Sequence, residues 1–260
     1  MTRARLIIYW DYELQIPEDV PTTPSLRRNG KRSYENTEYI LDVLKEHDIK
    51  TCFCVVGYHA QEGELPYHAP DQIRRMAREG HEVGSHGHTH RDITLLGKKE
   101  LYKEFRDSKQ AIEHITAEAC VSFAPPRNMP MRILWKDVSL AKGYRPNIQK
   151  RSLREIMQLL EKAGYETFRH YHRLIRPRLL QPRQRGRMTI YPLILPDNFD
   201  IAGHWLRKAI DEGKDLVVYS HPKALGRREK RDSFERFIRF AQEQRQKGLL
   251  SIALPRDGTP

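Results

Sequence analysis

The chain has 260 residues, 38% of them hydrophobic, and a formal net charge of +12. This length suits one large α/β domain, so we place no domain boundary within residues 1–260. No apolar run of about 18 residues could cross a membrane, and the first residues become charged too early for a signal peptide. We therefore expect no transmembrane segment and a cytoplasmic location.

The positive charge is concentrated in one region. Residues 150–190 contain eleven Lys or Arg and three Glu, a formal charge of +8. Such a region attracts nucleic acid, anionic membrane headgroups or phosphorylated small molecules, and it can equally be a solvated face. Because we find no nucleic-acid-binding motif, regular basic helix or zinc-finger spacing, we expect no nucleic-acid partner. No pattern in the sequence indicates an oligomeric state.

Short apolar runs alternate with amphipathic stretches through the first half of the chain, as in β/α units. We expect strands at 6–10, 51–57 and 81–86 and helices at 37–49, 71–80 and 99–116. Asp71 suits an N-cap and Gly80 a C-cap, which gives one helix clear boundaries. Cys52 and Cys54 alternate within an apolar strand and, with Cys120, are expected to be small core residues.

The same alternation continues through the second half of the chain. We expect strands at 119–126, 188–195, 215–222 and 249–254 and helices at 131–143, 151–164, 202–214 and 231–248. The arginine-rich stretch from Arg169 to Arg187 contains prolines and is predicted to be a loop. With no internal repeat, the whole pattern predicts an α/β barrel.

Acidic and histidine side chains follow several of the predicted strands. In a barrel of parallel strands, functional residues gather at the carboxyl ends, which is where Asp11, Glu13, His86, His90 and His221 fall. His86 and His90 are four positions apart, so one helical turn would bring both imidazoles to one side, as a zinc site requires. His88 joins them only if the segment is not helical. The alternative is a solvated polar turn, but the coincidence at strand ends favours an active site.

Five segments carry a resemblance to a known family. Residues 80–92 (GHEVGSHGHTHRD) resemble the second motif of the polysaccharide deacetylases, also called the NodB-homology family or carbohydrate esterase family four. Further similar motifs are 7–13 (IIYWDYE), 123–128 (FAPPRN), 140–146 (LAKGYRP) and 216–222 (LVVYSHP). The resemblance spans almost the whole chain and implies a distorted (β/α) barrel.

The resemblance also implies roles for individual residues. His86, His90 and Glu13 would bind a divalent metal, most simply Zn²⁺, with Co²⁺, Ni²⁺ or Mn²⁺ as alternatives, and His88 would not be a ligand. Asp11 would be the general base. His221 would give a proton to the departing amine, and the backbone N–H of Arg127 would help to hold the oxyanion.

Two positions depart from the family pattern. The third motif usually carries an arginine that orients the base, but this chain has Ala124 there, and Arg127 is the nearby candidate to replace it. The metal carboxylate is Glu13 where the family usually has aspartate. If this longer side chain cannot reach the metal, Asp11 would bind it, and a water or another carboxylate would act as the base.

We therefore expect a metal-dependent N-deacetylase that removes acetyl from an acetamido sugar, a precursor of a cell-surface polysaccharide such as O-antigen or capsule. The substrate could be nucleotide-linked or lipid-diphosphate-linked. A loop near the barrel mouth would then grip its phosphates through Arg176, Arg178, Arg183, Arg185 and Arg187. The alternatives are a related amidohydrolase or deformylase acting on another amide, a sugar-binding homologue that has lost catalysis, and a charge-driven nucleic-acid or membrane-surface binder.

Overall fold

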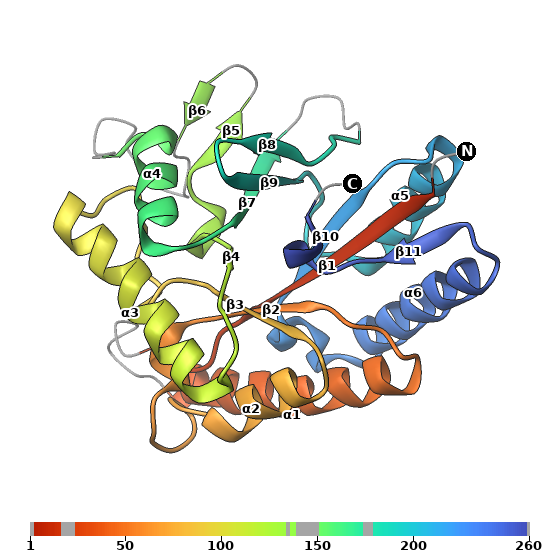
Figure 1. Cartoon of the computed structure of the whole chain (residues 1–260). Helices are drawn as coiled ribbons and strands as arrows, with labels where there is room; N and C mark the ends of the chain where they lie inside the picture. Colours follow the sequence, from red (N-terminus) through yellow and green to blue (C-terminus); the bar gives the residue numbers. More distant parts are fainter. Residues whose placement is uncertain (1–2, 17–23, 134–135, 139–150, 174–178, 259–260) are drawn as a thin grey trace.

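A strongly curved, mostly parallel sheet forms the centre of the computed structural model (Figure 1), which describes residues 3–16, 24–133, 136–138, 151–173 and 179–258. The strands run in the order β10-β1-β2-β3-β4-β7-β5-β6, with β11 beside β1 and β9 between β7 and β8. Their bounds are β1 (Ala4–Tyr12), β2 (Cys52–Val55), β3 (Glu82–Ser85), β4 (Ser122–Phe123), β5 (Met131–Ile133), β6 (Lys136–Val138), β7 (Thr167–Arg173), β8 (Arg183–Arg185), β9 (Met188–Leu193), β10 (Leu216–Ser220) and β11 (Leu250–Ile252). This curled sheet is the expected distorted barrel.

Helices cover the outside of the sheet. They are α1 (Pro24–Glu46), α2 (Pro70–Arg78), α3 (Lys98–Thr116), α4 (Leu153–Ala163), α5 (Phe199–Glu212) and α6 (Arg228–Gln246). The boundaries of α4 follow from its capping residues, because Ser152 accepts a hydrogen bond from the Glu155 N–H and Gly164 ends the helix at φ 88°. Asp71, by contrast, lies inside the first turn of α2, and Ala69 occupies the N-cap position. Among the described helices, none is long and apolar enough to span a membrane.

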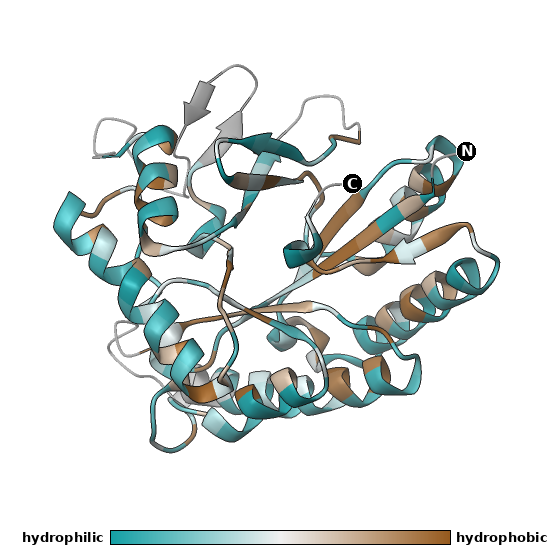
Figure 2. Cartoon of the chain, in the orientation of Figure 1, coloured by the Kyte–Doolittle hydropathy of each residue, from teal (hydrophilic) through white to brown (hydrophobic). Residues whose placement is uncertain are grey.

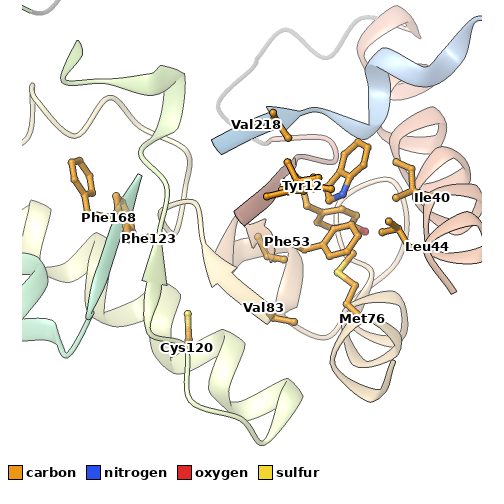
Figure 3. Close-up of a cluster of buried hydrophobic side chains, with 14 of the residues drawn as sticks. Tyr12, Ile40, Leu44, Phe53, Met76, Val83, Cys120, Phe123, Phe168 and Val218 are labelled. Atoms are coloured by element: carbon orange, nitrogen blue, oxygen red, sulfur yellow. The ribbon is translucent and has the colours of Figure 1, made fainter. Parts of the chain in front are cut away.

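Alternation along β1 separates the two faces of the sheet. Tyr12 and the other even-numbered residues of β1 face the helices, where they join a core that includes Phe53, Ile40, Leu44 and Met76 (Figure 3). Figure 2 shows the hydrophobic residues concentrated along β1 and β2, whereas the helices carry hydrophilic residues as well. Successive side chains of a strand point to opposite faces, so the odd-numbered residues of β1 face the inside of the barrel.

The inside of the barrel is filled by a second, smaller core of buried side chains. It consists of Ile7, Tyr9, Cys52, Cys54, Ala124, Tyr191, Leu193 and Val217. Cys52 and Cys54 are therefore core residues, as expected, and Cys120 is buried in the outer core.

Polar contacts close the amino-terminal end of the barrel. The buried Glu82 accepts hydrogen bonds from the hydroxyl of Ser122 and from the Arg256 N–H, the latter at 3.0 Å. Tyr191 donates its hydroxyl proton to the Pro255 carbonyl at 2.8 Å. These contacts attach the short helix η5 (Pro255–Asp257) to the end of the barrel where the strands begin.

Two expectations about secondary structure are wrong. The helix expected at 131–143 is replaced by β5 and β6, because Arg132 pairs with His172 of β7 and with Asp137 of β6. The loop expected from Arg169 to Arg187 contains the end of β7 and all of β8. In both places pairing with other strands of the sheet decides the conformation. The LAKGYRP motif (140–146) lies outside the described residues.

Candidate active site

Two carboxylates end the first strand on the same face. Asp11 is the penultimate residue of β1 and Glu13 follows the strand, so both continue the inward-facing row begun by Ile7 and Tyr9. Only 2% of Asp11 and 8% of Glu13 are exposed. Burying two carboxylates so close together requires compensating partners for each.

The histidine segment follows β3 as a loop, and not as the helical turn considered from the sequence. His90 has a left-handed φ of 62°. Glu104 of α3 holds the loop, because its carboxylate accepts hydrogen bonds from the His88 N–H and the Thr89 N–H at 2.9 Å each. His86 and His90 still come together, with ring centroids 5.1 Å apart.

Glu13, His86 and His90 form a group that could hold a metal ion. One ligand atom from each residue lies within 4.8 Å of the others. Glu13 Oε1 is 3.0 Å from His90 Nε2 and 3.4 Å from His86 Nε2. Both of these ring nitrogens are buried and have no hydrogen-bond partner. A donor set of two imidazoles and one carboxylate suits zinc and leaves coordination positions for water and substrate.

The hydrogen bonding of His86 prepares it to be a ligand. Its Nδ1 lies 2.8 Å from the Ala124 carbonyl, which can only accept, so Nδ1 carries the proton and Nε2 presents a lone pair. Burial lowers the pKa of His86 and thereby favours the neutral ring. The backbone of Ala124 therefore orients a ligand, although this position has alanine where the family resemblance implies arginine.

Asp11 is bound by an arginine from the other side of the barrel. Arg169 Nη1 and Nη2 donate to the two Asp11 oxygens at 2.6 and 2.7 Å, and Nη2 also donates to Asn128 Oδ1 at 3.0 Å. The guanidinium lies over the rings of Tyr9 and Tyr219, at 5.3 and 4.9 Å from their centroids. Burial alone would raise the pKa of Asp11, but the charge and the hydrogen bonds of Arg169 outweigh it and hold that pKa below its ordinary value.

His221 follows β10 and faces both carboxylates. Its Nε2 is 3.8 Å from Asp11 Oδ2 and 3.5 Å from Glu13 Oε1, while its Nδ1 lies 2.8 Å from Asp197 Oδ2. Burial alone would lower the pKa of His221, but the hydrogen bonds with Asp197 and Glu13 raise it to about 10. These contacts favour the protonated form of the ring, and Asp197 holds it in place.

Comparisons with known proteins show which family part of this chain is similar to. The family model described as polysaccharide deacetylase matches residues 29–144. A chitooligosaccharide deacetylase from Sinorhizobium fredii is 35% identical over 85 residues, which are 33% of this chain and 37% of that protein. The chain therefore resembles the polysaccharide deacetylase family over residues 29–144. It spans well under half the length of the curated relatives that it matches.

Solved structures extend the likeness in fold beyond the matched segment. A polysaccharide deacetylase structure from Mycobacterium smegmatis superimposes with a TM-score of 0.72 at 16% identity, covering 99% of this chain and 89% of that one. A structure of PuuE allantoinase superimposes with a TM-score of 0.69 at 18% identity, covering 98% of this chain and 89% of that one. At these identities the likeness concerns the fold of the polysaccharide deacetylase family alone.

The structure changes one assignment taken from the family motifs. Arg127 was the candidate to replace the arginine missing at Ala124, but its exposed side chain lines a small pocket with Arg91, Asp92 and Leu95. Arg169 binds Asp11 instead. The guanidinium that binds Asp11 therefore comes from β7, whereas the third motif would place it after β4.

Sequence reasoning missed four residues that contact the predicted ones. They are Asn128, Arg169, Asp197 and Lys223, whose Nζ contacts Glu13 Oε2. Alternation in the segment TFRHYHR could have identified a strand with Arg169 on one face. Asn128 and Lys223 lie in short 3-10 helices and Asp197 lies in a bend, and none of these segments has a periodic pattern to give such a signal.

Of the five arginines predicted to bind phosphate, the three that the structure describes do not gather at the site. Arg183 and Arg185 are on β8, Arg187 is in the turn to β9, and all three are exposed. Arg185 pairs with Met188 at the amino end of β9, and the Arg187 N–H donates to Glu161 of α4. This end of the barrel is opposite to the carboxylates. Arg176 and Arg178 lie outside the described residues.

Proposed function

We propose that this chain is a metal-dependent hydrolase of linear amides, an N-deacetylase that acts on an acetamido sugar. One observation carries the proposal: the potential metal group of Glu13, His86 and His90 lies beside the side chains of Asp11 and His221. Amide hydrolysis needs a base that takes a proton from water and an acid that gives one to the leaving nitrogen. Asp11 and His221 can supply this base and this acid, and both lie at the same end of the barrel.

Each buried group in this arrangement has a distinct task. A divalent ion, most simply zinc, would polarise the amide carbonyl and lower the pKa of a bound water toward neutrality. Asp11 takes the proton of the attacking water, and Arg169 keeps its carboxylate in one orientation. His221 donates its Nε2 proton to the nitrogen of the departing amine as the carbon–nitrogen bond breaks, while Asp197 stabilises the imidazolium.

The backbone N–H of Arg127 is proposed to stabilise the developing oxyanion. Arg127 and Asn128 both have left-handed backbone angles, at φ 58° and 55°, within a turn next to the paired prolines. The side chain of Asn128 is held by Arg169. The turn is therefore tied to the guanidinium that also binds Asp11, and a fixed N–H dipole is the kind of donor that oxyanion stabilisation requires.

The sugar and its linkage are proposed less specifically. The relative named above is a chitooligosaccharide deacetylase, which supports an acetylated amino sugar as the substrate class. A cytoplasmic precursor of a cell-surface polysaccharide, linked to a nucleotide or lipid diphosphate, stays a prediction. The three described arginines of the β8 hairpin do not support it, because they lie away from the mouth.

Two of the alternatives are judged from particular observations. The fold is shared with an allantoinase, so it does not by itself choose a sugar over a ureide or an N-formyl compound. Loss of catalysis was considered because of Ala124 and Glu13. The buried contacts of Arg169 with Asp11 and of Glu13 with His90 favour a working site instead.

The test is an acetate-release assay on zinc-reconstituted protein with free, nucleotide-linked and lipid-linked acetamido sugars. A ureide and an N-formyl amine are tested in parallel, each with an assay for its own product. The Asp11→Asn variant is the negative control. We expect acetate from at least one sugar. Turnover of the ureide or N-formyl compound alone would change the substrate class, and zinc binding without any turnover would support the binding protein.

A further inference from the structure

A short 3-10 helix connects the two sides of the potential metal site. This helix, η1 (Gly57–Ala60), follows β2. Its Gly57 N–H donates to the Gly87 carbonyl at 2.8 Å, and its Tyr58 N–H donates to the His88 carbonyl at 2.9 Å. Both carbonyls belong to the loop between His86 and His90. The backbone of η1 therefore holds the segment that carries both imidazoles.

The other side of the site is held by the side chain of His59. Its Nε2 accepts a hydrogen bond from the Leu14 N–H at 3.0 Å, and its Nδ1 lies 2.7 Å from the Tyr67 carbonyl. Leu14 directly follows Glu13 in the chain. Because His59 is 0% exposed, these two contacts are not shared with solvent.

The contacts of His59 fix its state. The Tyr67 carbonyl can only accept, so Nδ1 carries the proton, and Nε2 must be unprotonated because it accepts from Leu14. Burial lowers the pKa of His59 to about 3, which is consistent with a neutral ring. With both nitrogens engaged, the ring has no free position with which to bind a metal or transfer a proton.

Close packing leaves η1 little room to move. A Cβ atom added at Gly57 would lie 2.6 Å from Ser108 Cα of α3 and 2.9 Å from His88 Nδ1. Ser108 also donates its hydroxyl proton to the Gly87 carbonyl at 3.1 Å. The helix α3 thus backs both η1 and the histidine loop, and a shift of one would disturb the other.

We propose that His59 is a positioning residue that fixes the Glu13 carboxylate relative to the histidine loop. One short helix holds both sides: its backbone binds the loop of His86 and His90, and its His59 ring binds the chain next to Glu13. The three ligands are thereby arranged before a metal arrives, so less ordering remains to oppose binding. The inference rests on the proposed function only in taking these three residues as the ligands.

The test compares zinc dissociation constants, measured by competition with a chromophoric chelator. His59→Asn keeps an amide group near the position of Nδ1, within reach of the Tyr67 carbonyl, but cannot reach the Leu14 N–H. His59→Gln places an acceptor near the position of Nε2. We expect Asn to raise the dissociation constant by about 10- to 100-fold, the usual effect of losing a residue that orients a metal ligand, and Gln to recover most of that loss.

His81 provides a matched control. It is also buried, and its Nδ1 accepts from the Thr51 N–H at 3.1 Å, at the amino end of β2 and away from the metal group. His81→Gln removes an equivalent ring-to-backbone bond, so it should lower the melting temperature without changing the zinc dissociation constant. If His59→Asn does not fold, the proposal requires the small loss of zinc affinity that remains in His59→Gln, and His81→Gln must not share that loss.

The outcomes separate this inference from the proposed function. Tight zinc binding by the wild type together with unchanged binding by the His59 variants would overturn the positioning role and leave the deacetylase proposal standing. Equal weakening by the His59 and His81 variants would show a general loss of stability, and it would overturn the inference too. A wild type that does not bind zinc would contradict both proposals.

Discussion

Arg169 and Asp11 form a fork-to-fork ion pair in the barrel interior, although they lie 158 positions apart in the sequence. Arg169 is 0% exposed and Asp11 2%. Such a pair gains specificity from its geometry, whereas either charge left alone would carry a large desolvation cost. The pair also determines which carboxylate is available to the metal, because it occupies both oxygens of Asp11 and leaves Glu13 Oε1 to face the histidines.

Replacing Arg169 tests this geometry directly. Arg169→Lys keeps the charge but loses the planar fork, so Asp11 can rotate. We expect kcat to fall by about 10- to 100-fold with little change in zinc affinity, since misplacing a catalytic group by about 1 Å has an effect of that order. Arg5→Lys is the control, because Arg5 makes a similar two-point pair with Asp215 at the other end of β1. A wild-type kcat in Arg169→Lys would contradict the orienting role.

The two carboxylates should respond differently to neutralisation. Asp11→Asn keeps an oxygen for Arg169 but loses the proton acceptor, so kcat should drop by about 10²- to 10⁴-fold while the metal stays bound. Glu13→Gln should lose both turnover and tight zinc binding, because Glu13 belongs to the potential metal group. Zinc content and kcat, measured on the same preparations, give the answer. Loss of zinc from Asp11→Asn alone would mean that the two roles are exchanged.

Removing the partner of His221 should shift the pH profile. Asp197 holds the His221 Nδ1 proton and helps to raise the pKa of this ring to about 10. A general acid loses activity as pH rises through its pKa, so Asp197→Asn should move the basic limb of kcat to lower pH. Zinc affinity should change little. An unshifted basic limb would show that His221 is not the proton donor.

Buried His81 predicts a pH dependence of stability. Burial lowers its pKa from an ordinary 6.5 to about 3. Between these values the unfolded chain binds a proton that the folded chain does not, so the free energy of unfolding should fall as pH drops below 6.5. The slope is at most about 1.4 kcal/mol per pH unit for one such group.

His81→Asn removes this titration while keeping an acceptor for the Thr51 N–H. Urea unfolding at pH 5 and pH 7 should therefore show a smaller difference in unfolding free energy for the variant than for the wild type. An equal difference in both proteins would assign the acid sensitivity to other groups, such as the buried His59.

Local sequence patterns were sufficient for the elements whose burial repeats regularly. The apolar runs that became β1, β2 and β10 and the amphipathic segments that became α3 and α6 were predicted because hydrophobic periodicity reports which face is buried. The strand β7 was missed because Arg169, His170 and His172 are buried there, and such residues look like surface positions in a sequence. The contacts with Asp11, Asn128 and two tyrosine rings explain why Arg169 can be buried.

The site could be predicted in its residue types but not in its supporting contacts. Asp11, Glu13 and the histidines follow strands, and that placement brought them to one end of the barrel. The path of the histidine loop depends on Glu104 and on η1, which are far away in the sequence. Spacing alone suggested a helical turn, whereas the same two rings meet through a loop with a left-handed His90.

The alternation of side chains along β1 makes the fold and the position of the two carboxylates depend on the same strand register. Tyr9 is level with Cys52 of β2 and with Tyr219 of β10, and this register sends Asp11 into the barrel. A slip of one residue would turn Trp10 and Tyr12 inward and press both carboxylates against the helices, far from Arg169. A misregistered chain would therefore lose its aromatic core and its ion pair together. Selection for a stable barrel thus also preserves the placement of the two acids, and a single-residue insertion in β1 should be tolerated by neither the fold nor the site.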